Sequence, residues 1–210
     1  MAKQDTSINP RILESAKKEF LLHGYEQAST NVICKNAGVT WGALAKRYSG
    51  KDELFGALVS SVAEKFKVAL CGEQDSFHSM TKQEKENSAM DDKLTVEDFV
   101  NGIYDHFEEF RLLLVCSKGS SYENYFDELV DIVVASIIRF MNETGHEAVI
   151  KGKKATHEMI HMLVSSNLYG YFEPIAHGMS REDAMLYIEQ IQYFFNVGWA
   201  DILQLKVSAE

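Results

Sequence analysis

Residues 29–51 read STNVICKNAGVTWGALAKRYSGK, and this stretch decides the fold that the sequence predicts. Ser29 and Thr40 are good N-caps, and Gly38 stands where a short helix would end. Apolar residues recur at helical spacing between these signals, which predicts two short helices that meet at the tight turn AGVT. Two helices joined by a turn with a central glycine are typical of the helix-turn-helix motif.

The spacing of residues divides these two helices into an inner and an outer face. The inner face would pack against a preceding helix and comprises Ile33, Ala37, Val39, Leu44 and Tyr48. The outer face comprises Asn31, Thr40, Trp41, Ala43, Lys46 and Arg47. The outer set suits DNA because Lys46 and Arg47 can reach phosphates, and Asn31 can form paired hydrogen bonds with an adenine edge.

Two residues at helix starts admit more than one interpretation. Trp41 would waste its apolar area in water, so it lies either on a sugar or base edge of DNA or back on the first helix. Lys51 opposes the macrodipole of the helix that it begins, at a cost of about 0.3–1 kcal/mol. A phosphate contact would explain that lysine, and a solvated surface lysine is the alternative.

The helical pattern continues through most of the 210 residues. Asn9 and Pro10 begin a first helix that Gly24 ends, and Ser49 with Asp52 resembles a capping box for a fourth helix over about 50–71. Polar residues 72–93 indicate a long connection or a weak helix. Further helices are expected at about 94–116, 121–144, 154–177 and 181–206, and no strand pattern is found.

Charge and composition favour one class of partner and argue against others. Residues 1–70 carry 10 Lys+Arg and 7 Asp+Glu, a net charge of +3, whereas the remainder carries 11 and 24, a net charge of −13. A polyanion would therefore meet the first third, with chance variation in surface charge as the alternative. The longest apolar run, IVVASII at 132–138, is far shorter than the roughly 20 residues that cross a bilayer. No membrane partner is expected.

The location expected for the protein is the cytoplasm. Its first residues, MAKQDTSINP, lack the apolar region of a secretory signal. The 3 cysteines are odd in number, widely spaced and without zinc-binding spacing, which suits reduced thiols. We expect no cofactor.

The stretch RILESAKKEFLLHGYEQASTNVICKNAGVTWGALAKRYSGKDELF at 11–55 resembles the N-terminal domain of the tetracycline-repressor (TetR) family of bacterial regulators. The first helix is followed by hGY, then AGV-[ST]-x-G-x-L, an aromatic residue and x-x-K-x-x-L, and the match covers about residues 9–58. The resemblance implies a homodimer that binds a palindromic operator, usually as a repressor. A small molecule in the C-terminal domain would shift the spacing of the two DNA-reading heads.

Carried over by position, the resemblance assigns roles to individual residues. It implies phosphate or groove-edge contacts for Ser29 and Thr30, and backbone contacts for Arg47 and Lys51. Base-reading positions fall on Asn31, Trp41 and Ala43. Family members commonly have a phosphate-contacting tyrosine after the leucine of G-x-L, where this chain has Ala45, and the adjacent Lys46 is a candidate replacement.

The stretch HEMIH at 157–161 matches the zinc-peptidase pattern, because histidines at i and i+4 share a helix face. The extended form of that motif needs glycine and histidine where this chain has Val164 and Asn167. A structural or pocket histidine is therefore favoured over a metal sensor or a catalytic zinc site, and we expect neither a metal nor an enzyme. A zinc-dependent hydrolase stays open as an alternative function.

The remaining helices suggest a dimerisation and ligand-binding region. The last helix is apolar on two sides, one of which can face a second copy of the chain, with a helix buried inside a monomer as the alternative. Candidate ligand-lining residues are Phe107, Tyr122, Tyr125, Phe126, His161, Ser165 and Tyr169.

The sequence as a whole predicts an all-α protein. Residues 1–50 form a three-helix DNA-binding domain, 51–71 a connecting helix and 72–210 a helical ligand-binding and dimerisation domain. The predicted function is a ligand-responsive regulator that binds double-stranded operator DNA and an unknown small-molecule effector. A helical protein-interaction module without DNA binding is a further alternative, which Ala45 makes conceivable.

Overall fold

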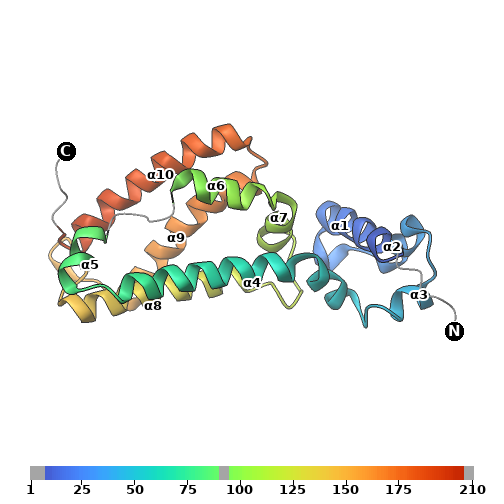
Figure 1. The fold of residues 1–210 in the computed structure, drawn as a ribbon, viewed down its shortest axis with the longest axis horizontal. Coiled ribbons are helices and arrows are strands. Elements are labelled where there is room, and N and C mark those ends of the chain that lie inside the picture. The colour runs from blue at the N-terminus through green and yellow to red at the C-terminus, as the bar shows by residue number, and fades with distance from the viewer. Residues whose placement is uncertain (1–7, 90–94, 206–210) are drawn as a thin grey trace. The chain divides into compact units, whose positions relative to one another are not determined.

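The computed structural model describes residues 8–89 and 95–205, and over these ranges the fold is all-α, as expected (Figure 1). The ten helices of these ranges are α1 (Ile8–Gln27), α2 (Thr30–Ala37), α3 (Trp41–Ala45), α4 (Lys51–His78), α5 (Lys82–Ser88), α6 (Val96–Tyr104), α7 (Phe107–Val115), α8 (Tyr125–Thr144), α9 (His157–Ala176) and α10 (Arg181–Ile202). No helix within these ranges combines the length and the hydropathy needed to cross a membrane.

The chain divides into two compact units. The first comprises Met1–Lys65 and His106–Phe126, and the second comprises Phe66–Asp105 and Asp127–Glu210. The first unit therefore holds α1–α3, the beginning of α4, and α7, whereas the second holds the remaining helices. The sequence-based boundaries at residues 50 and 71, which divide the chain into DNA-binding, connecting and ligand-binding parts, stay a prediction.

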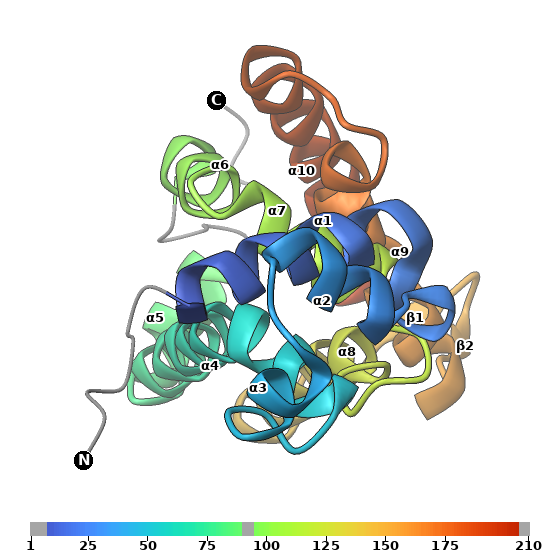
Figure 2. The ribbon, with the colours of Figure 1, turned by 90° about the vertical axis from the view of Figure 1, so that its right-hand side faces the viewer.

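The first unit is built around α1, which lies against α2 and α7 (Figure 2). Ile12, Ala16 and Phe20 of α1 are fully or almost fully buried, and the ring of Phe20 meets that of Phe55 edge-on with centroids 5.1 Å apart. Gly24 has φ 71° and ψ 165°, so the regular helix is interrupted there, as the sequence indicates. Beyond it, the Tyr25 N–H donates to the Cys116 carbonyl at 2.8 Å.

Local sequence signals set the bounds of the short helices as predicted. Ser29 occupies the N-cap of α2, and Gly38 ends that helix in the left-handed conformation with φ 65°. Thr40 caps α3, since its hydroxyl accepts a hydrogen bond from the Ala43 N–H at 3.2 Å. Helix α3 ends at Ala45, and residues 46–47 form a turn that leads into the bend before α4.

Residues 72–89 are more ordered than a long connection. Helix α4 runs on to His78, and α5 follows with a capping box between Thr81 and Glu84. The weak-helix interpretation is therefore correct for 72–78 and 82–88, while residues 90–94 lie outside the described ranges. This polar stretch is anchored by buried His78 and Lys85. Because polar side chains are the buried ones, the poor apolar periodicity of the stretch does not reveal its helices.

Two further expectations about secondary structure are wrong. The predicted helix 94–116 is two helices, α6 and α7, which separate at Asp105 and His106 and belong to different units. Within the basic stretch before α9, β1 (Val149–Ile150) pairs antiparallel with β2 (Lys153–Lys154). Lys151 and Gly152 between them have φ 49° and 78°, the tight hairpin geometry of two left-handed residues. Strands of two residues are too short to show a pattern in the sequence.

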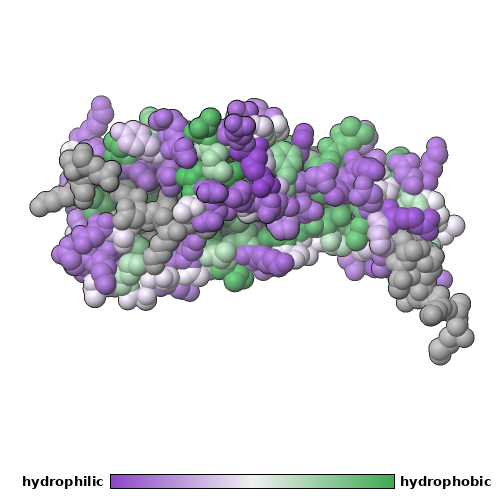
Figure 3. All heavy atoms as spheres, turned by 45° about the horizontal axis from the view of Figure 1, so that its top comes forward, coloured by the Kyte–Doolittle hydropathy of each residue, from purple (hydrophilic) through white to green (hydrophobic). Residues whose placement is uncertain are grey.

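The second unit packs aromatic and aliphatic side chains between its helices. The rings of Phe66, Phe99 and Phe172 lie within 6.3 Å of one another, and α10 buries Ala184, Ile188 and Trp199. The Ser180 hydroxyl accepts from the Asp183 N–H at 3.1 Å and caps α10. On the face drawn in Figure 3, apolar residues reach the surface in patches between hydrophilic ones.

Candidate nucleic-acid interface and ligand cavity

The inner face of α2 and α3 is fixed against α1. Ile33 and Leu44 are at most 3% exposed, and Val39 and Tyr48 are half-buried, as the sequence predicts. The Ser15 hydroxyl donates to the Ile33 carbonyl at 3.0 Å. These contacts hold the helix pair as one rigid head.

The start of α2 is tied to α1 by a buried carboxylate. The Ser29 N–H donates to Oε1 of Glu19 at 3.0 Å, and Glu19 is only 6% exposed. The Ser29 side chain forms no capping bond, and both Ser29 and Thr30 are half-buried. Their hydroxyls therefore stand at the beginning of α2, where backbone N–H groups favour an anion.

The outer face carries polar and apolar side chains toward solvent. Asn31, Thr40, Trp41, Ala45 and Lys46 are exposed, whereas Ala43 and Arg47 are half-buried. Trp41 is 62% exposed, so the arrangement in which it folds back onto α1 is not adopted. Trp41 is therefore accessible to a binding partner, and its contact with a base edge stays a prediction.

The three cations of this region differ in their contacts. Arg47 is held by two bonds, from Nε to Asn9 Oδ1 at 2.6 Å and from Nη1 to the Ala43 carbonyl at 3.0 Å. Lys51 donates from Nζ to the Glu26 carbonyl at 3.1 Å and lies 4.5 Å from the Tyr25 ring centroid. Lys46 forms no ion pair with the described residues. It is therefore the cation most available to a phosphate.

Lys51 has a structural explanation that the sequence does not reveal. Its Nζ also lies 3.4 Å from the Ala28 carbonyl, so it neutralises carbonyl groups after Gly24 at the end of α1. The capping carboxylate of α4 is Glu53 rather than the expected Asp52, since Glu53 Oε2 accepts from the Ser49 N–H at 2.6 Å. Hydrogen bonds from Ser49 lower the pKa of Glu53 below its usual value. Asp52 instead accepts from the Ser121 N–H at 2.8 Å.

The two histidines of HEMIH lie on α9 of the second unit. His157 is exposed, and His161 is half-buried with Nε2 3.7 Å from Asp131 Oδ1. Within residues 8–89 and 95–205, no group of three or more His, Cys, Asp or Glu side chains could hold a metal ion. The pair therefore gains no third ligand from the described residues.

The seven candidate ligand-lining residues are divided between the two units. Phe107, Tyr122, Tyr125 and Phe126 belong to the first unit, whereas His161, Ser165 and Tyr169 belong to the second. Tyr125 is buried and donates to the Ala63 carbonyl at 3.1 Å, and Tyr169 is 53% exposed. Ligand contact for these residues stays a prediction.

A cavity of about 240 Å³ lies in the second unit, and its lining includes none of the seven residues that the sequence suggests. Its lining residues are Glu73, Gln74, Phe77, Ser88, Ala89, Val133, Ser136, Ile137, Phe140, Asn167, Asn196, Trp199 and Leu203. The side-chain oxygen Oδ1 of Asn167 is buried without a hydrogen-bond partner among the described residues. The sequence features that point to this cavity are asparagines within apolar helices, Asn167 on α9 and Asn196 on α10.

Comparisons with known proteins find relatives that share the helix-turn-helix head and the all-helical fold. Residues 12–58 match the family model of the bacterial regulatory proteins of the tetR family. No curated protein matches the chain. A tetR-family regulatory protein from Rhodococcus RHA1 is 16% identical, with 90% of this chain and 97% of that chain covered and a TM-score of 0.52. A cysteine mutant of the regulator CifR, complexed with 26-bp operator DNA, is 14% identical, with 88% and 94% covered and a TM-score of 0.54.

The all-helical fold is like that of the tetR-family structures, and the head is the segment that matches the family model. Residues 12–58 are therefore similar to the segment that defines the tetR family of bacterial regulatory proteins.

Proposed function

We propose that this chain is a ligand-responsive transcriptional repressor that binds a palindromic DNA operator as a homodimer in the cytoplasm. The supporting observation is the outer face of α2 and α3, where an exposed Trp41 stands beside Asn31 and Lys46 on helices fixed by buried residues. No catalytic step is part of the proposal.

In this proposal, α3 enters the major groove and reads bases through its first turn. Trp41 and Ala43 lie on that turn and meet base edges, while Lys46 at its end contacts a phosphate. Lys46 replaces the contact that Ala45 cannot make. Lys51 supports the head through the end of α1, and its phosphate contact is secondary to that role.

The homodimer is supported by two exposed apolar stripes. On α9 the stripe comprises Met159, Met162 and Tyr169, and on α10 it comprises Leu186, Tyr193, Phe194 and Val197. The α9 set recurs at steps of three and seven residues, and Leu186, Tyr193 and Val197 recur at steps of seven and four, with Phe194 beside them on α10. Exposed apolar patches of this kind mark interaction sites, and two-fold symmetric pairing is the commonest way to cover them.

The cavity of the second unit supplies a place for the effector. A ligand shifts an equilibrium only by its difference in affinity between two states. We therefore propose that the effector binds the dimer conformation whose heads are wrongly spaced for the operator, and so releases the DNA.

The test is selection from a random duplex library with the full-length protein at near-physiological salt. The proposal predicts enrichment of one palindrome, with half-sites about one helical turn apart or slightly more. A folded dimer that enriches no sequence would contradict the proposal and favour a helical protein-interaction module.

A further inference from the structure

The cavity of the second unit combines an apolar wall with hydrogen-bonding groups. Phe77, Val133, Ile137, Phe140, Trp199 and Leu203 supply the apolar part. Gln74, Ser136, Asn167 and Asn196 supply amide and hydroxyl groups. Sites of this composition bind small molecules, because the apolar wall provides affinity and the few polar groups fix orientation.

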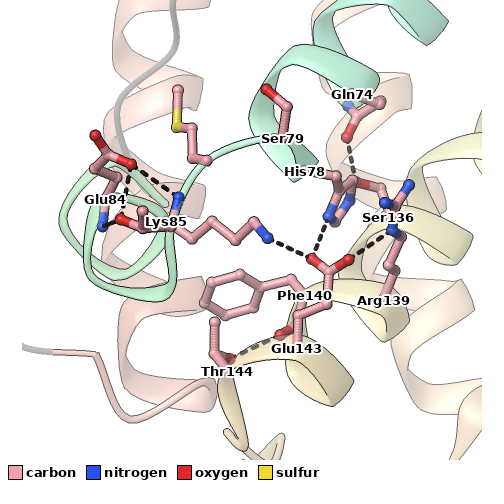
Figure 4. Close-up of polar contacts among 12 residues, drawn as sticks. Gln74, His78, Ser79, Glu84, Lys85, Ser136, Arg139, Phe140, Glu143 and Thr144 are labelled. Carbon is pink, nitrogen blue, oxygen red and sulfur yellow. Dashed lines mark hydrogen bonds and ion pairs between the residues drawn. The ribbon is translucent and has the colours of Figure 1, made fainter.

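Hydrogen bonds to His78 and Glu143 hold the polar part of the lining at Gln74 and Ser136 in place (Figure 4). The Ser136 hydroxyl donates to Gln74 Oε1 and lies 2.8 Å from His78 Nε2. The other ring nitrogen of His78, Nδ1, donates to Glu143 Oε2 at 2.8 Å. The histidine side chain is 2% exposed, so these bonds position the two cavity residues rigidly.

Glu143 anchors this network through two further cations. Lys85 Nζ lies 2.8 Å from Glu143 Oε2, and Arg139 Nε lies 2.8 Å from Oε1. Hydrogen bonds from Lys85, His78 and Arg139 lower the pKa of Glu143 to about 2. Both oxygens of the carboxylate therefore accept hydrogen bonds within the network. The neutral groups of Gln74 and Ser136, which line the cavity, are the ones that contact a ligand.

Asn167 on α9 favours a ligand that carries a hydrogen-bond donor. Its Oδ1 is a buried acceptor without a partner among the described residues. Leaving such an atom unpaired costs about 1–3 kcal/mol, which a donor on the ligand would recover. A ligand without a donor would leave that cost in place.

The charge of the lining excludes anions as good ligands. Glu73 is the one ionisable side chain among the described lining residues, and it is exposed. An anion would lose its hydration without a cation to replace it, and would meet a negative charge at the edge. Burying a cation would also be costly, because no carboxylate lines the inner wall.

We propose that this cavity binds an uncharged ligand that has a small apolar body and a primary amide or hydroxyl group, whose N–H or O–H donates to Asn167 Oδ1. The volume of about 240 Å³ suits a ligand smaller than typical drug-sized molecules. That this ligand acts as the effector rests on the proposed function, whereas its binding does not.

The test uses three probes of equal size that differ in one end group: octanamide, octanoate and methyl heptanoate. Octanamide is neutral and carries a donor, octanoate is an anion, and methyl heptanoate is neutral without a donor. The chain has 2 tryptophans, so Trp41→Phe leaves Trp199 in the cavity wall as the sole tryptophan reporter. Binding is read from its fluorescence at neutral pH in the absence of DNA.

Octanamide is expected to bind saturably, and about tenfold or more tightly than either other probe. In Asn167→Leu, which removes the unpaired acceptor at similar volume, this preference should fall to within about twofold. Ser166→Ala is the matched control, since Ser166 is the exposed neighbour on α9 and lies outside the lining. The control should retain the full preference.

Three results would overturn the proposal: no saturable binding of any probe, octanoate binding as tightly as octanamide, or a preference that survives Asn167→Leu. Circular dichroism of each variant shows whether it is folded, and a misfolded Asn167→Leu is replaced by Asn167→Val. Operator selection is a separate experiment. Amide-selective binding without operator enrichment would therefore refute the proposed function alone.

Discussion

Among single residues, Trp41 carries the most direct prediction for DNA binding. It is 62% exposed, so Trp41→Ala removes little packing from the free protein. We expect operator affinity to fall about tenfold or more, the usual cost of a lost base contact, with the thermal stability unchanged. Fluorescence anisotropy with the selected duplex measures the affinity.

Leu22→Ala is the matched control for Trp41→Ala, because Leu22 is 74% exposed and lies on α1 outside the reading face. Its operator affinity should stay within about twofold of the unmodified protein. Equal losses in both variants would show that Trp41 contributes only nonspecific apolar surface.

The lysines at 46 and 51 should separate DNA contact from support of the head. Lys46→Ala is expected to reduce the slope of log affinity against log salt by about one, because one phosphate contact is lost. Lys51→Ala should lower the free energy of unfolding by about 1 kcal/mol, since its bonds to the carbonyl groups of Glu26 and Ala28 disappear. Salt titrations and urea denaturation measure the two quantities. The reverse pattern would refute this assignment.

Spacing alone predicts the faces of the head but not the contacts of its cations. The buried set around Ile33 and Leu44 follows from helical periodicity, which the structure confirms. The partners of Arg47 and Lys51 lie 38 and 25 positions earlier in the chain. Such distant pairs depend on how the helices pack, so the sequence could not show that both side chains are already engaged.

At the level of helices, caps are predictable because their chemistry is local. Thr40 and Ser180 each accept from an N–H three residues later, and the identity of the residue suffices to predict it. The end of α4 depends on a distant contact instead, since His78 is anchored by Glu143, 65 positions away. For the same reason, the cavity escaped sequence analysis: its lining comes from α4, α5, α8, α9 and α10.

The Glu143 network predicts an acid-sensitive contribution to stability. The pKa of Glu143 is about 2 in the folded chain against a usual value of 4.5. The carboxylate therefore stabilises the fold above about pH 4.5, and this stabilisation disappears as the pH falls toward 2. Glu143→Gln should lower the melting temperature at pH 7 by several degrees, because buried Lys85 loses its partner, and should weaken the pH dependence below 4.5.

Glu147→Gln provides the control for that experiment. Glu147 pairs with Lys154 at 2.5 Å, but the two side chains are 60% and 71% exposed. An exposed pair contributes little, so the melting curves should match those of the unmodified protein. The network account would be refuted if Glu143→Gln behaved like Glu147→Gln at every pH.

For the whole molecule, the exposed stripes predict a dimer that one charge can disrupt. Phe194 is 67% exposed in the single chain, and Phe194→Asp would place a carboxylate in the proposed interface. We expect a folded monomer by sedimentation, with operator affinity lowered about a hundredfold or more because the two half-sites no longer bind together. Val68→Asp, at a residue 68% exposed on α4, should remain a dimer.

The central claim is that two copies of this chain read one palindrome. The measurement that tests it most directly is the mass and affinity of the complex formed with the selected duplex at near-physiological salt, beside a scrambled duplex of equal length. The account predicts two chains per duplex and an affinity at least about a thousandfold higher than for the scrambled duplex. One chain per duplex, or equal affinity for both duplexes, would contradict it.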